Sequence, residues 1–93
     1  MTAIGLDSVV TRVEGFSTAQ VQDNLMMLDV QQGAYYSLDP IGAEIWNLME
    51  QPTPVRDIVD RLKDRYAVSL EQCMADVLAF LEDMLKNGMI QVQ

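Results

Sequence analysis

The sequence contains no histidine and only one cysteine, and these two shortages exclude most of the common catalytic chemistry. Without histidine, the chain lacks the commonest general base, the usual partner of a catalytic serine or cysteine, and the commonest metal ligand. Cys73 alone provides neither an internal disulfide nor a multi-cysteine metal site. The five glycines are scattered singly, so there is no glycine-rich phosphate loop. We therefore expect no enzyme activity, no metal site and no cofactor.

Basic side chains are also scarce, since six lysines and arginines face fourteen aspartates and glutamates, giving a net charge of −8. Most of the basic residues fall in the stretch 56–65, where they alternate with aspartates as on the solvated face of a helix. Affinity for nucleic acid depends largely on basic side chains at the phosphates. The charge balance therefore argues against nucleic acid as a partner.

Long apolar runs are missing as well: none approaches the roughly 20 residues that a membrane-spanning helix needs. The first residues also lack the basic region and apolar stretch of a signal peptide. We expect no membrane partner and a cytoplasmic location. A chain of 93 residues, 49% of them hydrophobic, suffices for one small core. We expect residues 1–7 to form a flexible N-terminal tail and residues 8–93 to form one domain.

The first half of the chain favours strands. A β-branched run at Val9, Val10 and Val13 comes first, Gly15 interrupts it, and residues 18–22 alternate only weakly. Residues 25–30 form an apolar strand. The turn at 31–33 and the aromatic stretch 34–38 then complete a predicted hairpin.

The second half favours three helices with clear boundaries. Asp39-Pro40 supplies an N-cap followed by proline at the first helical position, and Thr53-Pro54 repeats this start signal. Ser69-x-x-Gln72 is a capping box that opens the third helix, and Gly88 ends it. Residues 89–92 form a short final strand or simply pack against the core. We predict an α+β, winged-helix-like fold, with a three-stranded antiparallel sheet followed by a three-helix bundle.

The third predicted helix has an unusually wide apolar arc. At 100° per residue, one stripe is wide enough for a core face. This stripe consists of Leu70, Met74, Val77, Leu78, Leu81 and Leu85. Cys73, Phe80 and Met84 form a second stripe on one flank, with Asp76 and Asp83 just beyond it. Two interpretations stay open: the flank is buried against the hairpin, or it borders an apolar trough beside the hairpin.

Tyr35 and Tyr36 are adjacent in the last predicted strand of the hairpin. Alternation along a strand sends their rings to opposite faces of the sheet. At least one ring is therefore expected to be partly exposed.

The segment 28–49 (Leu-Asp-Val-Gln-Gln-Gly-Ala-Tyr-Tyr-Ser-Leu-Asp-Pro-Ile-Gly-Ala-Glu-Ile-Trp-Asn-Leu-Met) resembles the PqqD-like family, the RiPP recognition elements. It looks similar in particular to the stand-alone members encoded with lasso peptides. Typical of the family are a strand ending in Tyr-Tyr, a polar turn with proline, and a helix with Gly-Ala and Ile-Trp. The match continues through residues 57–62, 65–66, 76–81 and 87–90, so that it covers about residues 8–92.

The resemblance implies a non-catalytic adaptor. Such an adaptor binds the leader region of a ribosomally synthesised precursor peptide as an added strand and presents it to a maturation enzyme. For lasso peptides, that enzyme is a leader peptidase. Carried over to this sequence, the implied peptide-binding residues are Ala34, Tyr35, Tyr36, Ser37, Leu38, Cys73, Asp76, Val77, Phe80 and Met84. An exposed strand edge also leaves open a homodimer.

Two other functions compete with this interpretation. One is an accessory subunit that stabilises a radical or peptidase enzyme without touching its substrate. The other is a winged-helix DNA-binding protein, which needs basic or amide side chains on its recognition helix. The third helix offers only Lys86 near its end, among several acidic residues, so charge disfavours DNA binding.

Overall fold

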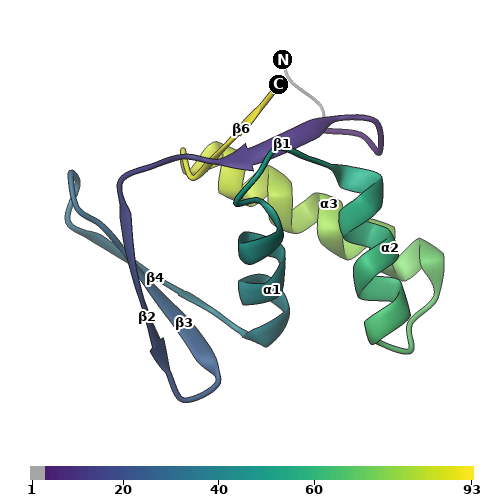
Figure 1. The fold of residues 1–93 in the computed structure, drawn as a ribbon, viewed down its shortest axis with the longest axis horizontal. Coiled ribbons are helices and arrows are strands. Elements are labelled where there is room, and N and C mark those ends of the chain that lie inside the picture. The colour runs from purple at the N-terminus through teal and green to yellow at the C-terminus, as the bar shows by residue number, and fades with distance from the viewer. Residues whose placement is uncertain (1–3) are drawn as a thin grey trace.

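A computed structural model describes residues 4–93, which form two three-stranded antiparallel sheets and three helices (Figure 1). In chain order the elements are β1 (Val9–Arg12), β2 (Phe16–Val21), β3 (Asn24–Asp29), β4 (Ala34–Leu38), α1 (Pro40–Leu48), β5 (Thr53–Pro54), α2 (Val55–Arg65), α3 (Leu70–Lys86) and β6 (Ile90–Val92). The predicted α+β class and the three predicted helices are confirmed.

The predicted hairpin forms the centre of one sheet, whose strand order is β2-β3-β4. β3 pairs with β4 from Leu25↔Leu38 to Asp29↔Ala34. Asp29 closes the turn, because its carboxylate accepts hydrogen bonds from the backbone N–H groups of Gln31 and Gln32 at 3.1 and 3.2 Å. In Figure 1 this sheet projects to one side of the three helices.

The first strand belongs to a different sheet from the hairpin, which the sequence did not predict. β1 lies between β5 and β6, with Val10 opposite both Thr53 and Val92. The chain leaves this sheet at Gly15, whose φ of 108° is accessible to glycine but strained for other residues. The sheet is therefore split into two, and the β-branched run at residues 9–12 packs away from the hairpin.

The start of α2 also differs from the prediction. Thr53 and Pro54 form the short strand β5, and Pro54 precedes the helix without a side-chain cap. The Thr53 hydroxyl donates instead to the carbonyl groups of Leu48 and Gln51, both at 2.8 Å. Thr53 therefore ties the end of α1 to β5 and does not cap α2.

The caps of the other two helices agree with the prediction. The Asp39 carboxylate accepts from Gly42 N at 2.7 Å, and the Ser69 hydroxyl accepts from Gln72 N at 3.1 Å. The Gln72 side chain bonds to Asp76 at 2.9 Å, so only half of the predicted capping box is present. Gly88 follows α3 with a φ of 73°, as expected for a helix end.

Residues 4–7 are packed, in contrast to the expected flexible tail at residues 1–7. Ile4 is buried, Leu6 packs against the core, and the Leu6 carbonyl accepts from Arg56 N at 3.1 Å. Asp7 and Arg56 form an ion pair. Residues 1–3 of the predicted tail lie outside the described residues.

The core lies between the helices and both sheets. Its fully buried side chains include Met27 of β3, Met49 after α1, Ile58 of α2 and Leu81 of α3. Within residues 4–93, no helix combines the length and the apolar content that crossing a membrane requires.

Candidate functional site

The free side of β4 is the first element of the candidate site. β4 pairs with β3 on one side, and no strand of the described chain pairs with its other side. The N–H and C=O groups of alternate residues point to that unpaired side. β4 contains no charged residue and no proline, which are the usual features that protect a strand edge from pairing. Its backbone is therefore ready to accept another strand.

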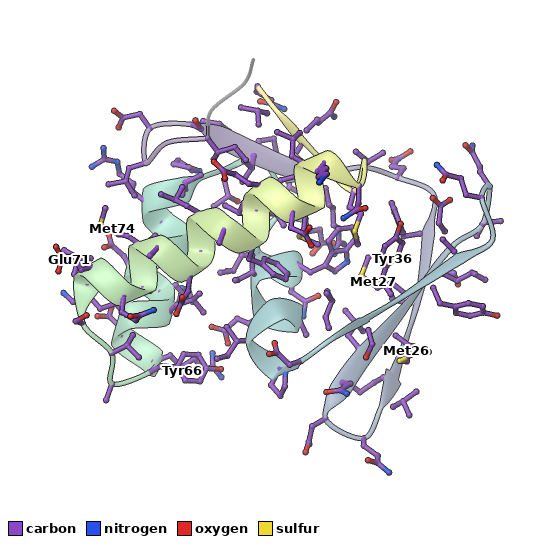
Figure 2. All side chains as sticks on the ribbon, turned by 180° about the vertical axis from the view of Figure 1, so that it is seen from behind. Met26, Met27, Tyr36, Tyr66, Glu71 and Met74 are labelled. Carbon is purple, nitrogen blue, oxygen red and sulfur yellow. The ribbon has the colours of Figure 1, made fainter. Side chains whose placement is uncertain are left out.

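The side chains of β4 alternate as the sequence predicts. Tyr35 is 74% exposed and Ser37 is exposed, whereas Leu38 is buried and Ala34 and Tyr36 are half-buried. Tyr36 packs edge to face on Phe16, with ring centroids 6.3 Å apart, and Phe16 packs in the same way on Trp46 at 5.7 Å. Tyr36, labelled in Figure 2, thus fixes the sheet to α1, whereas the exposed ring is that of Tyr35.

The flank of α3 that the sequence singled out is the core face of this helix. Cys73, Val77 and Met84 are at most 4% exposed, and only Phe80, which is half-buried, and Asp76, which is exposed, reach the surface. The stripe predicted to face the core is buried only in part: Val77 and Leu81 are buried, whereas Leu70 is 48% exposed and Met74, Leu78 and Leu85 are half-buried. The predicted core stripe is therefore right for Val77 and Leu81 and wrong for the other four residues, because the core face is displaced toward Cys73 and Met84. The centre of the buried arc lies on the row Cys73, Val77, Leu81 and Met84.

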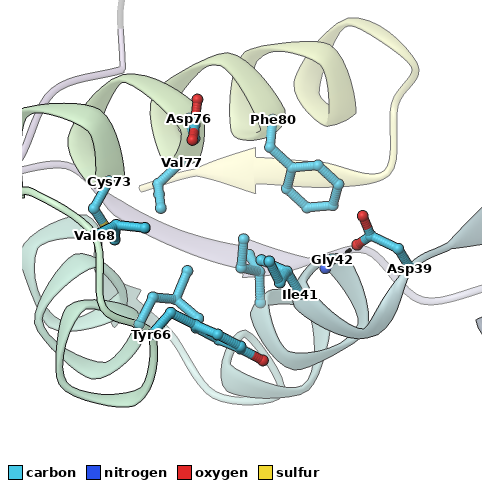
Figure 3. Close-up of a pocket in the computed structure, with 11 residues that line it drawn as sticks. Asp39, Ile41, Gly42, Tyr66, Val68, Cys73, Asp76, Val77 and Phe80 are labelled. Carbon is cyan, nitrogen blue, oxygen red and sulfur yellow. Dashed lines mark hydrogen bonds between the residues drawn. The ribbon is translucent and has the colours of Figure 1, made fainter. Parts of the chain in front are cut away.

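A pocket of about 290 Å³ lies between the first turn of α1, the end of α2 and α3 (Figure 3). Its walls are mainly apolar, and it is open to solvent. The lining residues are Asp39, Ile41, Gly42, Ile45, Leu62, Tyr66, Val68, Cys73, Asp76, Val77 and Phe80. Four of the ten predicted site residues are among them, all on α3, whereas residues 34–38 and Met84 are not.

Asp39 connects the strand edge to the pocket. It follows Leu38 directly, caps α1 through its bond to Gly42 N, and lines the pocket. The free edge of β4 therefore ends where the pocket begins. Asp39 and Asp76 bring two carboxylates to the pocket, with no basic residue among its lining.

The sequence missed Ile41, Tyr66 and Val68 as pocket residues. Ile41, in the first turn of α1, is 43% exposed, and Val68, in the turn between α2 and α3, is 44% exposed. Apolar side chains in the turn between α2 and α3 were the available signal. They can be recognised as pocket residues only once the fold places this turn near the first turn of α1.

Cys73 lies at the inner wall of the pocket as a buried thiol. Its Sγ donates to the carbonyl of Val59 at 3.6 Å. Burial raises the pKa of the Cys73 thiol, and the nearby carboxylates of Asp76 and Asp60 raise it further. The thiol is therefore neutral near pH 7 and a poor nucleophile.

The fold and the site together define a class of protein: a winged-helix-like α+β domain with an open strand edge leading into an apolar pocket. The family model described as Coenzyme PQQ synthesis protein D (PqqD) matches residues 24–90. The chain therefore belongs to the PqqD family, and the predicted PqqD-like membership is confirmed.

Two solved structures resemble the chain over most of its length. TbiB1 in complex with the TbiA(beta) leader peptide has a TM-score of 0.78 and 26% sequence identity, covering 87% of this chain and 94% of that chain. Lasso peptide synthetase B1 complexed with the leader peptide has a TM-score of 0.78 and 23% identity, covering 88% and 96%. At this identity, the second likeness concerns the fold alone. A comparison with curated protein sequences gave no match.

Proposed function

We propose that this chain binds the leader region of a ribosomally synthesised precursor peptide by strand addition to β4. The observation that carries the proposal is the unprotected free edge of β4 ending at an apolar pocket. TbiB1, a structural relative at 26% identity that was solved with a leader peptide, supports it. We further propose that the chain acts as one non-catalytic domain. This domain presents the leader to a maturation enzyme, a leader peptidase in lasso-peptide biosynthesis.

Backbone pairing provides the first part of the affinity. An extended peptide beside β4 satisfies the N–H and C=O groups that β3 leaves unpaired. Each such bond contributes about 0.5–1.5 kcal/mol net, whatever the side chain of the peptide. The backbone therefore selects for an extended conformation and leaves the choice of sequence to the side chains.

An apolar anchor provides the second part. The peptide beside β4 reaches the pocket near Asp39, where one side chain of the peptide enters between Ile41, Tyr66 and Phe80. Burying one leucine-sized side chain contributes about 1.5–3 kcal/mol. Four backbone bonds and one or two anchors give roughly 4–12 kcal/mol before the ordering of the peptide is subtracted. We expect affinities in the micromolar to nanomolar range.

The ten site residues take different roles in this proposal. Residues 34–38 supply backbone groups, and Phe80 and Asp76 contact the anchor and its neighbours. Cys73 and Val77 form the inner wall of the pocket, and Met84 is a buried residue that packs α3 against the core. Because two carboxylates border the pocket, leaders with lysine or arginine beside the anchor bind more tightly than acidic ones.

The proposal can be tested with a peptide selected against the chain from a displayed library of random linear peptides. In a set of variants of this peptide, each backbone nitrogen in turn is methylated, which removes one N–H donor. Strand addition predicts that methylation weakens binding at alternate positions, because only every second N–H faces β4. Uniform tolerance of methylation, measured by fluorescence polarisation, would contradict strand addition.

A second test uses Phe80→Ala. We expect a loss of affinity of about 10- to 100-fold, because the anchor loses roughly 1.5–3 kcal/mol of apolar contact. A thermal melt must show that the variant remains folded. Unchanged affinity in a folded variant would place the anchor elsewhere. Binding that requires an added enzyme would favour the accessory-subunit alternative, so the chain is titrated alone.

A further inference from the structure

Gly42 is a buried glycine within the first turn of α1, where its backbone has an ordinary helical conformation. Glycine is a poor helix former compared with alanine, so the helix itself gives no reason for it. The reason lies in the neighbours. A Cβ atom at position 42 would lie 3.2 Å from both Cε1 and Cζ of Phe80, and 3.3 Å from Oδ1 of Asp39. The absent side chain therefore makes room for the Phe80 ring.

Phe80 is the wall of the pocket that this glycine positions. Its ring reaches from α3 to the first turn of α1 and stands close to Gly42 and Asp39 (Figure 3). The backbone of this turn is held by the 2.7 Å bond from Gly42 N to Asp39. Because the ring is half-buried and borders open pocket space, it is the part that can move.

From this contact we infer that Gly42 and Phe80 together determine the size of the leader side chain that the pocket accepts. The inference rests on the proposed function and adds a substrate class to it. With glycine at position 42, the ring lies back against α1 and leaves space for a large apolar side chain such as leucine, isoleucine, methionine or phenylalanine. A methyl group at position 42 pushes the ring by a few tenths of an ångström toward the pocket, which then accepts only a smaller side chain.

In this inference Gly42 acts by positioning the Phe80 ring. The melting temperature of a variant distinguishes this role from a merely structural one. Gly42→Ala improves helix propensity in α1 and so offsets part of the crowding. The variant is expected to melt near the temperature of the parent but to lose affinity for large anchors. Each methylene that no longer fits lowers affinity about fourfold.

The test is a selection of random linear peptides on four proteins: the parent, Gly42→Ala, Gly42→Ala combined with Phe80→Leu, and Gly5→Ala. Gly5 is a matched control, because a Cβ there meets no atom within 4 Å. We expect the parent and Gly5→Ala to enrich peptides with one large apolar residue at a fixed position. Gly42→Ala should enrich alanine or valine at that position, and the double variant should return to large residues.

Each outcome decides a separate question. If Gly42→Ala enriches the same anchor as the parent, the size inference is overturned while peptide binding stands. If the parent enriches no peptide at all, the proposed function itself fails, and the inference fails with it. If the double variant still enriches small anchor residues, the Phe80 ring does not determine the size of the anchor.

Discussion

Cys73 illustrates how the surroundings of one residue decide its chemistry. The sequence places Cys73 in an apolar stripe of the third predicted helix, and the structure buries it there, with a hydrogen bond to the carbonyl of Val59. Its low reactivity could be predicted from the sequence, because the chain has no histidine that could activate a cysteine within an amphipathic helix by forming the thiolate.

The raised pKa of Cys73 predicts how stability depends on pH. Above the ordinary thiol pKa of 9.0, the unfolded chain loses this proton while the folded chain keeps it, so ionisation favours unfolding. The free energy of unfolding of the parent should fall relative to that of Cys73→Ala as pH rises above 9.0, by at most about 1.4 kcal/mol per pH unit. Urea unfolding of both proteins between about pH 7 and 10 measures the difference. Parallel pH curves would contradict the burial of the thiol.

Helix caps give a matched pair of predictions at the scale of elements. Asp39→Ala and Ser69→Ala each remove one side-chain bond to a helix N-terminus, so each should lower the free energy of unfolding by about 0.5–2 kcal/mol. Only Asp39 borders the pocket. Peptide affinity should therefore fall in Asp39→Ala and stay unchanged in Ser69→Ala, as titration of both variants will show. Equal peptide affinities of the two variants would show that the first turn of α1 is not part of the binding site.

Elements with local signals were predictable from the sequence, and those that depend on distant partners were not. Asp39, Ser69 and Gly88 mark helix ends through local signals, so the predicted start of α1 and both predicted ends of α3 agree with the structure. The pairing of β1 with β5 and β6 joins segments about 40 and 80 residues apart, for which a single sequence carries no register. The second sheet was missed for this reason.

The candidate site was predictable in part for the same reason. Alternation along β4 predicted that one of the two tyrosines is exposed. The wide apolar arc of α3 predicted more apolar side chains than a single core stripe requires. Which of these side chains face the core depends on the direction in which α3 packs. Ile41 and Val68 come to the pocket from two different segments, and only the packing of the helices brings them together.

At the scale of the whole molecule, the net charge of −8 predicts that salt weakens the binding of basic peptides. A selected peptide with two lysines beside its anchor should bind several-fold more weakly at about 0.5 M NaCl than at about 0.05 M, where screening is slight. The same peptide with glutamines in place of the lysines should change little. Titrations of both peptides at the two salt concentrations provide the measurement, and equal salt dependence would argue against the carboxylates at the pocket.

The exposure of β2 has a consequence for local opening of the molecule. Five of its six residues are exposed, so this outer strand adds little burial to the sheet that presents β4. Amide hydrogens of β2, β3 and β4 should therefore exchange with deuterium faster than those of α3, which is anchored in the core. A peptide strand docked on β4 should slow that exchange across the whole sheet, out to β2 on the opposite border, so that protection spreads well past the groups it touches.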